Sequence, residues 1–208
     1  MKMSDPRKNI SFGPIALSIA SFAALLVVAF VEAATRDNVL FHQVLNTVRV
    51  TMVLFAVAMC LYVLPGDSAR RSNYWIMFWT VSFISYAVHV YFSFVLFFHA
   101  SIHEFFAAQG ALVATTNLVV TAWWTLDFLL AWFTDSSPKW INVERTIIKL
   151  LILFLFFLST VILHAVDNKE TVVIVLGVLQ ALSVLVCWIV RLRAQKQTVN
   201  PASPVPTK

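Results

Sequence analysis

Six apolar runs dominate the sequence, and each is close to the roughly 20 residues that a helix needs to cross the hydrocarbon core of a bilayer. The runs cover about residues 12–34, 44–64, 74–99, 108–133, 146–166 and 171–190. Backbone amides and carbonyls find no water inside a membrane, so runs of this length must form helices rather than strands. The sequence therefore predicts an all-α integral membrane protein, a six-transmembrane-helix bundle with short loops, in which residues 1–193 form a single domain.

The composition agrees with this fold class and excludes a soluble globular protein. Hydrophobic residues make up 60% of the chain and charged residues 12%, whereas soluble domains have about 45–50% and about 25%. The basic residues lie between the apolar runs and form no patch of the kind that binds nucleic acid. We expect the lipid bilayer to surround the chain and expect no nucleic-acid partner.

The positions of lysine and arginine predict the orientation. Only Arg36, Arg49 and Lys169 of the 15 basic residues fall on the side opposite the N-terminus. Under the positive-inside rule both termini are cytoplasmic, which predicts a multi-pass protein of the cell (inner) membrane. The first run exceeds the 7–15 apolar residues of a signal peptide and is expected to be a retained helix. The proline-containing tail, residues 194–208, is predicted to be disordered.

This topology brings four histidines to the outer interface. They are His42, His99, His103 and His164. His99 and His103 are spaced i, i+4, so they face the same way if the helix continues between them, and Glu104 and Glu32 lie on the same side. Imidazole ligates zinc, copper, nickel or iron, which makes these six residues a candidate metal site. The alternative is that they are interfacial side chains that bind nothing.

His89 lies roughly 15 Å deeper along the third run. It belongs to a polar stripe that is expected to face protein. The stripe consists of Ser82, Ser85, Tyr86, His89 and Ser93. Asn117 of the fourth run lies at a similar depth, so the third and fourth helices are predicted to pack together. A hydrogen bond from His89 to Asn117 or a nearby serine would contribute about 0.6–2 kcal/mol. The alternative is a cofactor site at His89 and Asn117, holding haem or a transition metal.

Two further charges fall inside apolar runs. Asp127 lies in the inner half of the fourth run, at a depth comparable to that of Arg145 and Lys149, which are its natural partners unless the acid is protonated. Glu32 and Arg49 are expected to pair near the outer interface. Both pairs are interpreted as structural links between helices.

Motifs do not identify a reaction. The chain has only four glycines and no phosphate-binding glycine loop, and neither GxSxG nor HExxH occurs. We favour a noncatalytic helical subunit or scaffold of a membrane assembly, whose partner is another membrane protein or a second copy. The alternatives are a membrane redox or metal protein, and a small proton-coupled transporter using His89, Asn117 and Asp127.

Overall fold

The computed structural model describes residues 10–64, 69–134, 139–157 and 171–199, and every regular element in these ranges is a helix. Within these ranges, four helices are long and apolar enough to cross a membrane. They are Phe12–Ala34, Val39–Val63, Asn73–Phe97 and Ile102–Phe133. Within the described ranges this confirms an all-helical fold with four helices that are candidates for spanning a membrane. The count of six stays a prediction, because part of the fifth run falls outside the described residues.

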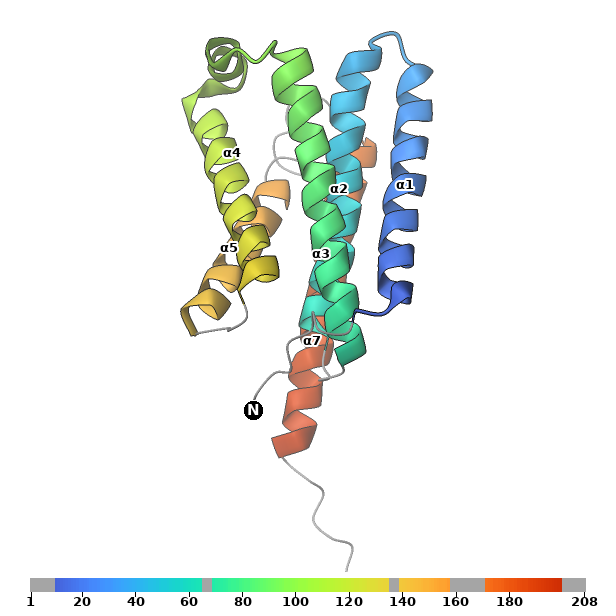
Figure 1. Ribbon diagram of the computed structural model, residues 1–208, viewed down its shortest axis with the longest axis vertical. Coiled ribbons are helices and arrows are strands. Elements are labelled where there is room, and N and C mark those ends of the chain that lie inside the picture. The colour runs from blue at the N-terminus through green and yellow to red at the C-terminus, as the bar shows by residue number, and fades with distance from the viewer. Residues whose placement is uncertain (1–9, 65–68, 135–138, 158–170, 200–208) are drawn as a thin grey trace, which may run out of the picture.

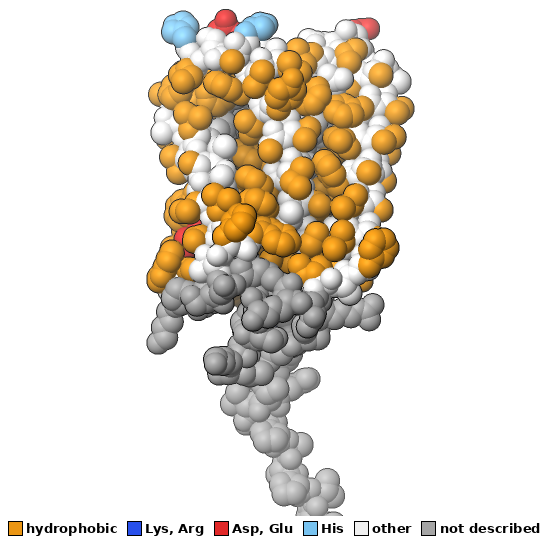
Figure 2. Space-filling model, in the orientation of Figure 1, with side chains coloured by type: hydrophobic (Ala, Val, Ile, Leu, Met, Phe, Trp, Pro, Cys, Tyr) orange, Lys and Arg blue, Asp and Glu red, His pale blue; other side chains and the backbone are white. Residues whose placement is uncertain are grey.

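The helices run up and down in a bundle (Figure 1). In chain order they are α1 (Phe12–Ala34), α2 (Val39–Val63), α3 (Ala69–Val90), the π-helix η2 (Tyr91–Phe97), α4 (Ile102–Phe133), α5 (Lys139–Phe157) and α7 (Thr171–Val199). Helix α2 packs against α1, α3 and α7, while α4 packs against α3 and α5. On the face shown in Figure 2, apolar side chains cover the flank, and histidine and most of the acidic groups in view gather at one end.

Side-chain caps explain why two helices begin earlier than the apolar runs. Asn38 precedes α2, and its side chain accepts a hydrogen bond from the Phe41 amide at 3.1 Å. Ser101 precedes α4 and accepts from the Glu104 amide at 3.2 Å. Such caps satisfy backbone donors that have no partner within the helix. The predicted apolar runs did not include these first turns, residues 39–43 and 102–107.

The last helix is longer than predicted. Helix α7 continues past Val190 to Val199, so residues 194–199 of the tail that was predicted to be disordered are helical. Lysine, arginine and glutamine form helices readily even where no apolar face requires one. The rest of that predicted tail, residues 200–208, lies outside the described residues.

Two helices depart from α geometry near the same end of the bundle. Helix α3 passes into η2, which ends where His99 and Ala100 adopt φ values of 51° and 55°. Because these two residues are left-handed, the helix is interrupted between η2 and α4. Within α4, Gly110 has φ 75° and ψ 157°, a conformation that favours glycine. The bend at Gly110 separates a short segment, residues 102–109, from the long part of α4 (Figure 1).

Aromatic rings form the centre of the core. The side chain of Trp124 on α4 has an exposed fraction of 0%. Its ring lies 5.3 Å from that of Trp79, 5.0 Å from Tyr86 and 5.8 Å from Phe55. A hydrogen bond of 2.7 Å joins the hydroxyls of Tyr86 and Thr121. These contacts confirm that the third and fourth predicted helices pack together.

Candidate functional site

The histidines predicted to lie at the outer interface are not gathered into a metal centre in the part of the chain that the structure describes. His99 Nδ1 lies 3.3 Å from Glu104 Oε2, and both side chains are exposed. No three histidine, cysteine or acidic side chains within the described ranges are grouped so as to hold a metal ion. His164 lies outside those ranges, so the complete ligand set, which also includes His42, His103 and Glu32, stays a prediction.

The backbone explains why the i, i+4 argument does not apply to His99 and His103. That argument required one continuous helix through both residues. Instead, the left-handed residues His99 and Ala100 end η2, and Ser101 caps the start of α4. His99 therefore lies in the turn between η2 and α4, whereas His103 lies in the first turn of α4, and the two imidazoles do not share a helix face.

His89 faces protein, as predicted, but its partner is a different helix. Its Nδ1 lies 3.0 Å from the Val44 carbonyl oxygen and 3.4 Å from Thr47 Oγ1, both on α2. The predicted hydrogen bond to Asn117 is absent, and Asn117 Nδ2 instead donates to Gln109 Oε1 at 2.7 Å across the bend in α4. His89 and Asn117 thus hydrogen-bond to different partners, and a cofactor site at these two residues stays a prediction.

Four members of the polar stripe, Ser82, Ser85, Tyr86 and Ser93, are buried, as expected, and side-chain hydrogen bonds along α3 join neighbouring helices. Thr51 Oγ1 of α2 donates to Ser85 Oγ at 2.9 Å. On the other side, the indole of Trp132 on α4 donates to Thr80 Oγ1 at 2.9 Å. Helix α3 is therefore linked through side chains to both α2 and α4, in addition to the Tyr86 contact already described.

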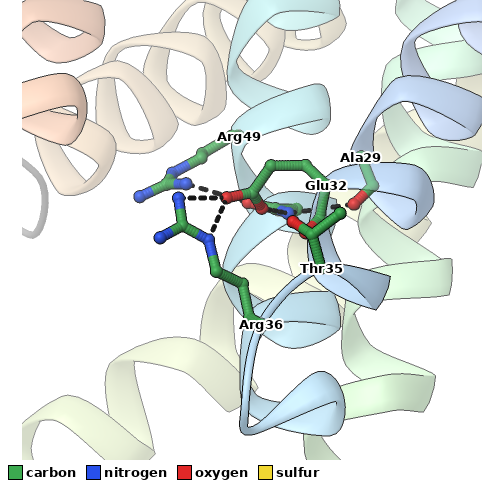
Figure 3. A network of polar contacts seen from close by, with 6 residues as sticks. Ala29, Glu32, Thr35, Arg36 and Arg49 are labelled. Carbon is green, nitrogen blue, oxygen red and sulfur yellow. Dashed lines mark hydrogen bonds and ion pairs between the residues drawn. The ribbon is translucent and has the colours of Figure 1, made fainter.

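A second polar network joins α1 to α2 (Figure 3). Asn46 donates a hydrogen bond to Glu32 and another, at 2.9 Å, to the Ala29 carbonyl. Arg36 forms an ion pair of 2.7 Å with Glu32, and Arg49 donates to Asn46 Oδ1 at 2.8 Å. Both arginines point toward Glu32 in Figure 3. Glu32 and Arg49, which were predicted to pair, belong to one network in which Asn46, a residue that the sequence did not indicate, is the bridge.

The third polar group, which we name the acid–base cluster, joins α4 to α5 and consists of Asp127, Glu144, Arg145 and Lys149. Asp127 Oδ1 lies 3.3 Å from Arg145 Nε, and the Asp127 side chain is 0% exposed. Glu144 Oε1 accepts a hydrogen bond of 2.6 Å from the Trp123 indole. The predicted pairing of Asp127 with Arg145 is confirmed. Glu144 also belongs to the cluster but was not predicted, although it lies next to Arg145 in the sequence.

Lys149 is surrounded by three aromatic rings, which we name the aromatic cage. Its ammonium nitrogen lies 4.1 Å from the ring centre of Tyr62, 4.8 Å from that of Trp75 and 5.1 Å from that of Trp79. A cation over an aromatic face is attracted by the negative charge of the ring surface. The cage was not predicted from the sequence. The available signal was the presence of Tyr62, Trp75 and Trp79 near the inner ends of the second and third runs, at the depth of Lys149.

The transporter hypothesis required three residues that the structure places against different neighbours. His89 contacts α2, Asn117 contacts Gln109 within α4, and Asp127 contacts α5. Of the three, only Asp127 belongs to a cluster of charged groups. The acid–base cluster is therefore the strongest candidate site in the described part of the chain. Comparisons with known protein families, with curated proteins and with solved structures gave no match to this chain.

Proposed function

We propose that this chain is a noncatalytic helical subunit or scaffold of a membrane assembly. The observation that supports this function is that the buried polar side chains link neighbouring helices. Links of this kind join α1 to α2, α2 to α3, α3 to α4 and α4 to α5. Hydrogen bonds between helices help to hold bundles together in lipid, where water cannot drive apolar association. Such links favour a structural role over a catalytic one.

The proposal includes six crossings with both termini in the cytoplasm of the cell (inner) membrane. Its support is the up-and-down order of the helices, together with the distribution of lysine and arginine. A direct test is Ser101→Cys in a variant without Cys60 and Cys187, treated in intact cells with an impermeant maleimide. We expect labelling before lysis, and Ser137→Cys serves as the matched inner control. Labelling of Ser101→Cys only after lysis would reverse the orientation.

A subunit must contact a partner along its lipid-facing surface. We propose to place a photo-crosslinking amino acid at Val28, Leu118 or Leu185, whose exposed fractions are 66%, 44% and 53%. The partner is expected to be another membrane protein or a second copy of this chain. A discrete cross-linked protein should appear from at least one position, while the buried control position Ala114, exposed by 0%, should give none. Cross-links to lipid alone from all three positions would contradict the proposal.

The redox alternative has a separate test in the visible spectrum and metal content of the purified protein. A noncatalytic subunit predicts neither a haem absorption band nor a stoichiometric transition metal. If either is found and is lost in a His89→Ala or His103→Ala variant, the redox alternative replaces the subunit proposal.

A further inference from the structure

Lys149 is a buried cation whose donors are not matched by an acceptor. Its exposed fraction is 1%, and its Nζ has no hydrogen-bond partner among the described residues. An ammonium group carries three N–H donors. The aromatic cage attracts the positive charge but offers no oxygen to accept these hydrogens.

Unmatched acceptors lie in the same cluster. Neither carboxylate oxygen of Asp127, and only one of Glu144, has a hydrogen-bond partner in the described ranges. Both acids are close enough to act electrostatically on Lys149. The donors of Lys149 and the free acceptor oxygens of the two acids therefore lie in one cluster with no hydrogen bond between them among the described residues, while Asp127 Oδ1 keeps its 3.3 Å ion pair with Arg145 Nε.

The charged surroundings of Lys149 come from several helices. Helix α2 contributes Tyr62, α4 contributes Asp127, and α5 itself contributes Glu144 and Arg145. Helix α3 contributes two indole rings of the aromatic cage, which do not titrate. The cluster thus holds two acids and two bases, so its formal charges balance when all four groups are ionised.

Buried polar groups in proteins are nearly always paired, and ordered water supplies the partner where protein atoms do not. An internal water typically makes about three hydrogen bonds to such groups. An ionisable group inside a membrane bundle is also expected to mark a functional site. We therefore expect ordered water to partner the N–H donors of Lys149 and the free carboxylate oxygens of the two acids.

We propose that the acid–base cluster is a hydrated proton-exchange centre in which water bridges Lys149 to Asp127 and Glu144. In the transfer step an N–H bond of the ammonium breaks and its proton passes to the bridging water. That water gives one of its own protons to a carboxylate oxygen, so an O–H bond forms and the water is regenerated. The products are a neutral amine and a carboxylic acid, and the net charge of the cluster is unchanged. This property goes beyond the proposed function, because a noncatalytic subunit does not need to exchange protons.

The test is infrared difference spectroscopy of the full chain in lipid bilayers. We expect the carbonyl stretch of a protonated carboxyl group to appear or disappear between about pH 4 and pH 10, which covers the ordinary pKa values of carboxyl and lysine groups. On transfer to D₂O the band should shift within the mixing time, because water reaches the centre. A dry ion pair gives either no titrating band or a band that shifts only over hours, and both results would overturn the proposal.

Three variants assign the band. It should be lost in Asp127→Asn or in Glu144→Gln, and it should persist in Glu32→Gln, the matched control for a carboxyl in the separate α1–α2 network. Persistence in both cluster variants, or loss in the control alone, would overturn the assignment and the proposal. If Asp127→Asn does not fold, Glu144→Gln and the D₂O measurement on the unmodified chain still decide the question.

Discussion

Replacement of Trp124 by alanine tests whether aromatic packing holds α2, α3, α4 and α5 together. Five rings surround the indole, those of Phe55, Trp79, Phe83, Tyr86 and Phe156. Each aromatic pair contributes about 0.5–1.5 kcal/mol, so an additive sum would be roughly 2.5–7.5 kcal/mol.

The expected loss for Trp124→Ala lies near the lower end of that sum, for two reasons. Contributions of neighbouring contacts are not additive, and in lipid the unfolded reference state also surrounds the indole with apolar atoms. We therefore expect the free energy of unfolding to fall by about 3 kcal/mol, the lower end of the range for such changes in soluble cores. The indole nitrogen makes no hydrogen bond to a described residue, so the loss is one of packing.

The assay uses the two cysteines of the chain, Cys60 and Cys187, which are half-buried. Their alkylation rate, measured over a titration with sodium dodecyl sulfate, reports the fraction of unfolded protein. The matched control is Trp140→Ala, because Trp140 is 58% exposed and its removal should cost less than about 0.5 kcal/mol. Equal losses in Trp124→Ala and Trp140→Ala would refute the role assigned to the aromatic core.

Three further variants test separate features. Tyr86→Phe should cost about 0.6–1.7 kcal/mol by removing the hydrogen bond between α3 and α4, whereas Tyr91→Phe, at a ring exposed by 52%, should leave the unfolding midpoint unchanged; equal effects would exclude that role for the bond. Ala100→Gly should stabilise the protein by about 1 kcal/mol, because Ala100 has φ 55°, and the helical control Ala107→Gly should have the opposite sign. Asp127→Ala should destabilise the protein by roughly 3 kcal/mol, because it removes the carboxylate that faces two cations on α5; a loss below about 1 kcal/mol in the same titration would contradict this.

The sequence was sufficient to predict helices whose bounds are set by the length of an apolar run. The bounds of α1 match the first apolar run, since a lipid-spanning helix is defined by the residues that enter the hydrocarbon. The inward orientation of the α3 stripe and the pairing of Asp127 with Arg145 also followed, because buried polar groups must face protein and charges at equal depth tend to pair.

Lateral arrangement could not be predicted in the same way. Depth along a helix is a property of the sequence, but the choice of neighbouring helix depends on packing across the whole bundle. His89 and Asn117 lie at similar predicted depths, yet His89 bonds to α2 and Asn117 bonds across a bend. The break at His99 was missed for a related reason, because neither His99 nor Ala100 is a residue that normally marks a left-handed turn.

We expect the bend at Gly110 to let α4 fit bilayers of different thickness. A straight helix over all of Ile102–Phe133 would be roughly 48 Å long, whereas the hydrocarbon core is about 30 Å thick. Such a hydrophobic mismatch forces a straight helix to tilt or to thicken the lipid around it. Because the chain turns at Gly110, only residues 111–133, roughly 35 Å in length, need to cross. We expect changes in bilayer thickness to alter the angle of residues 102–109, while the crossing part keeps its tilt and its contacts with α5.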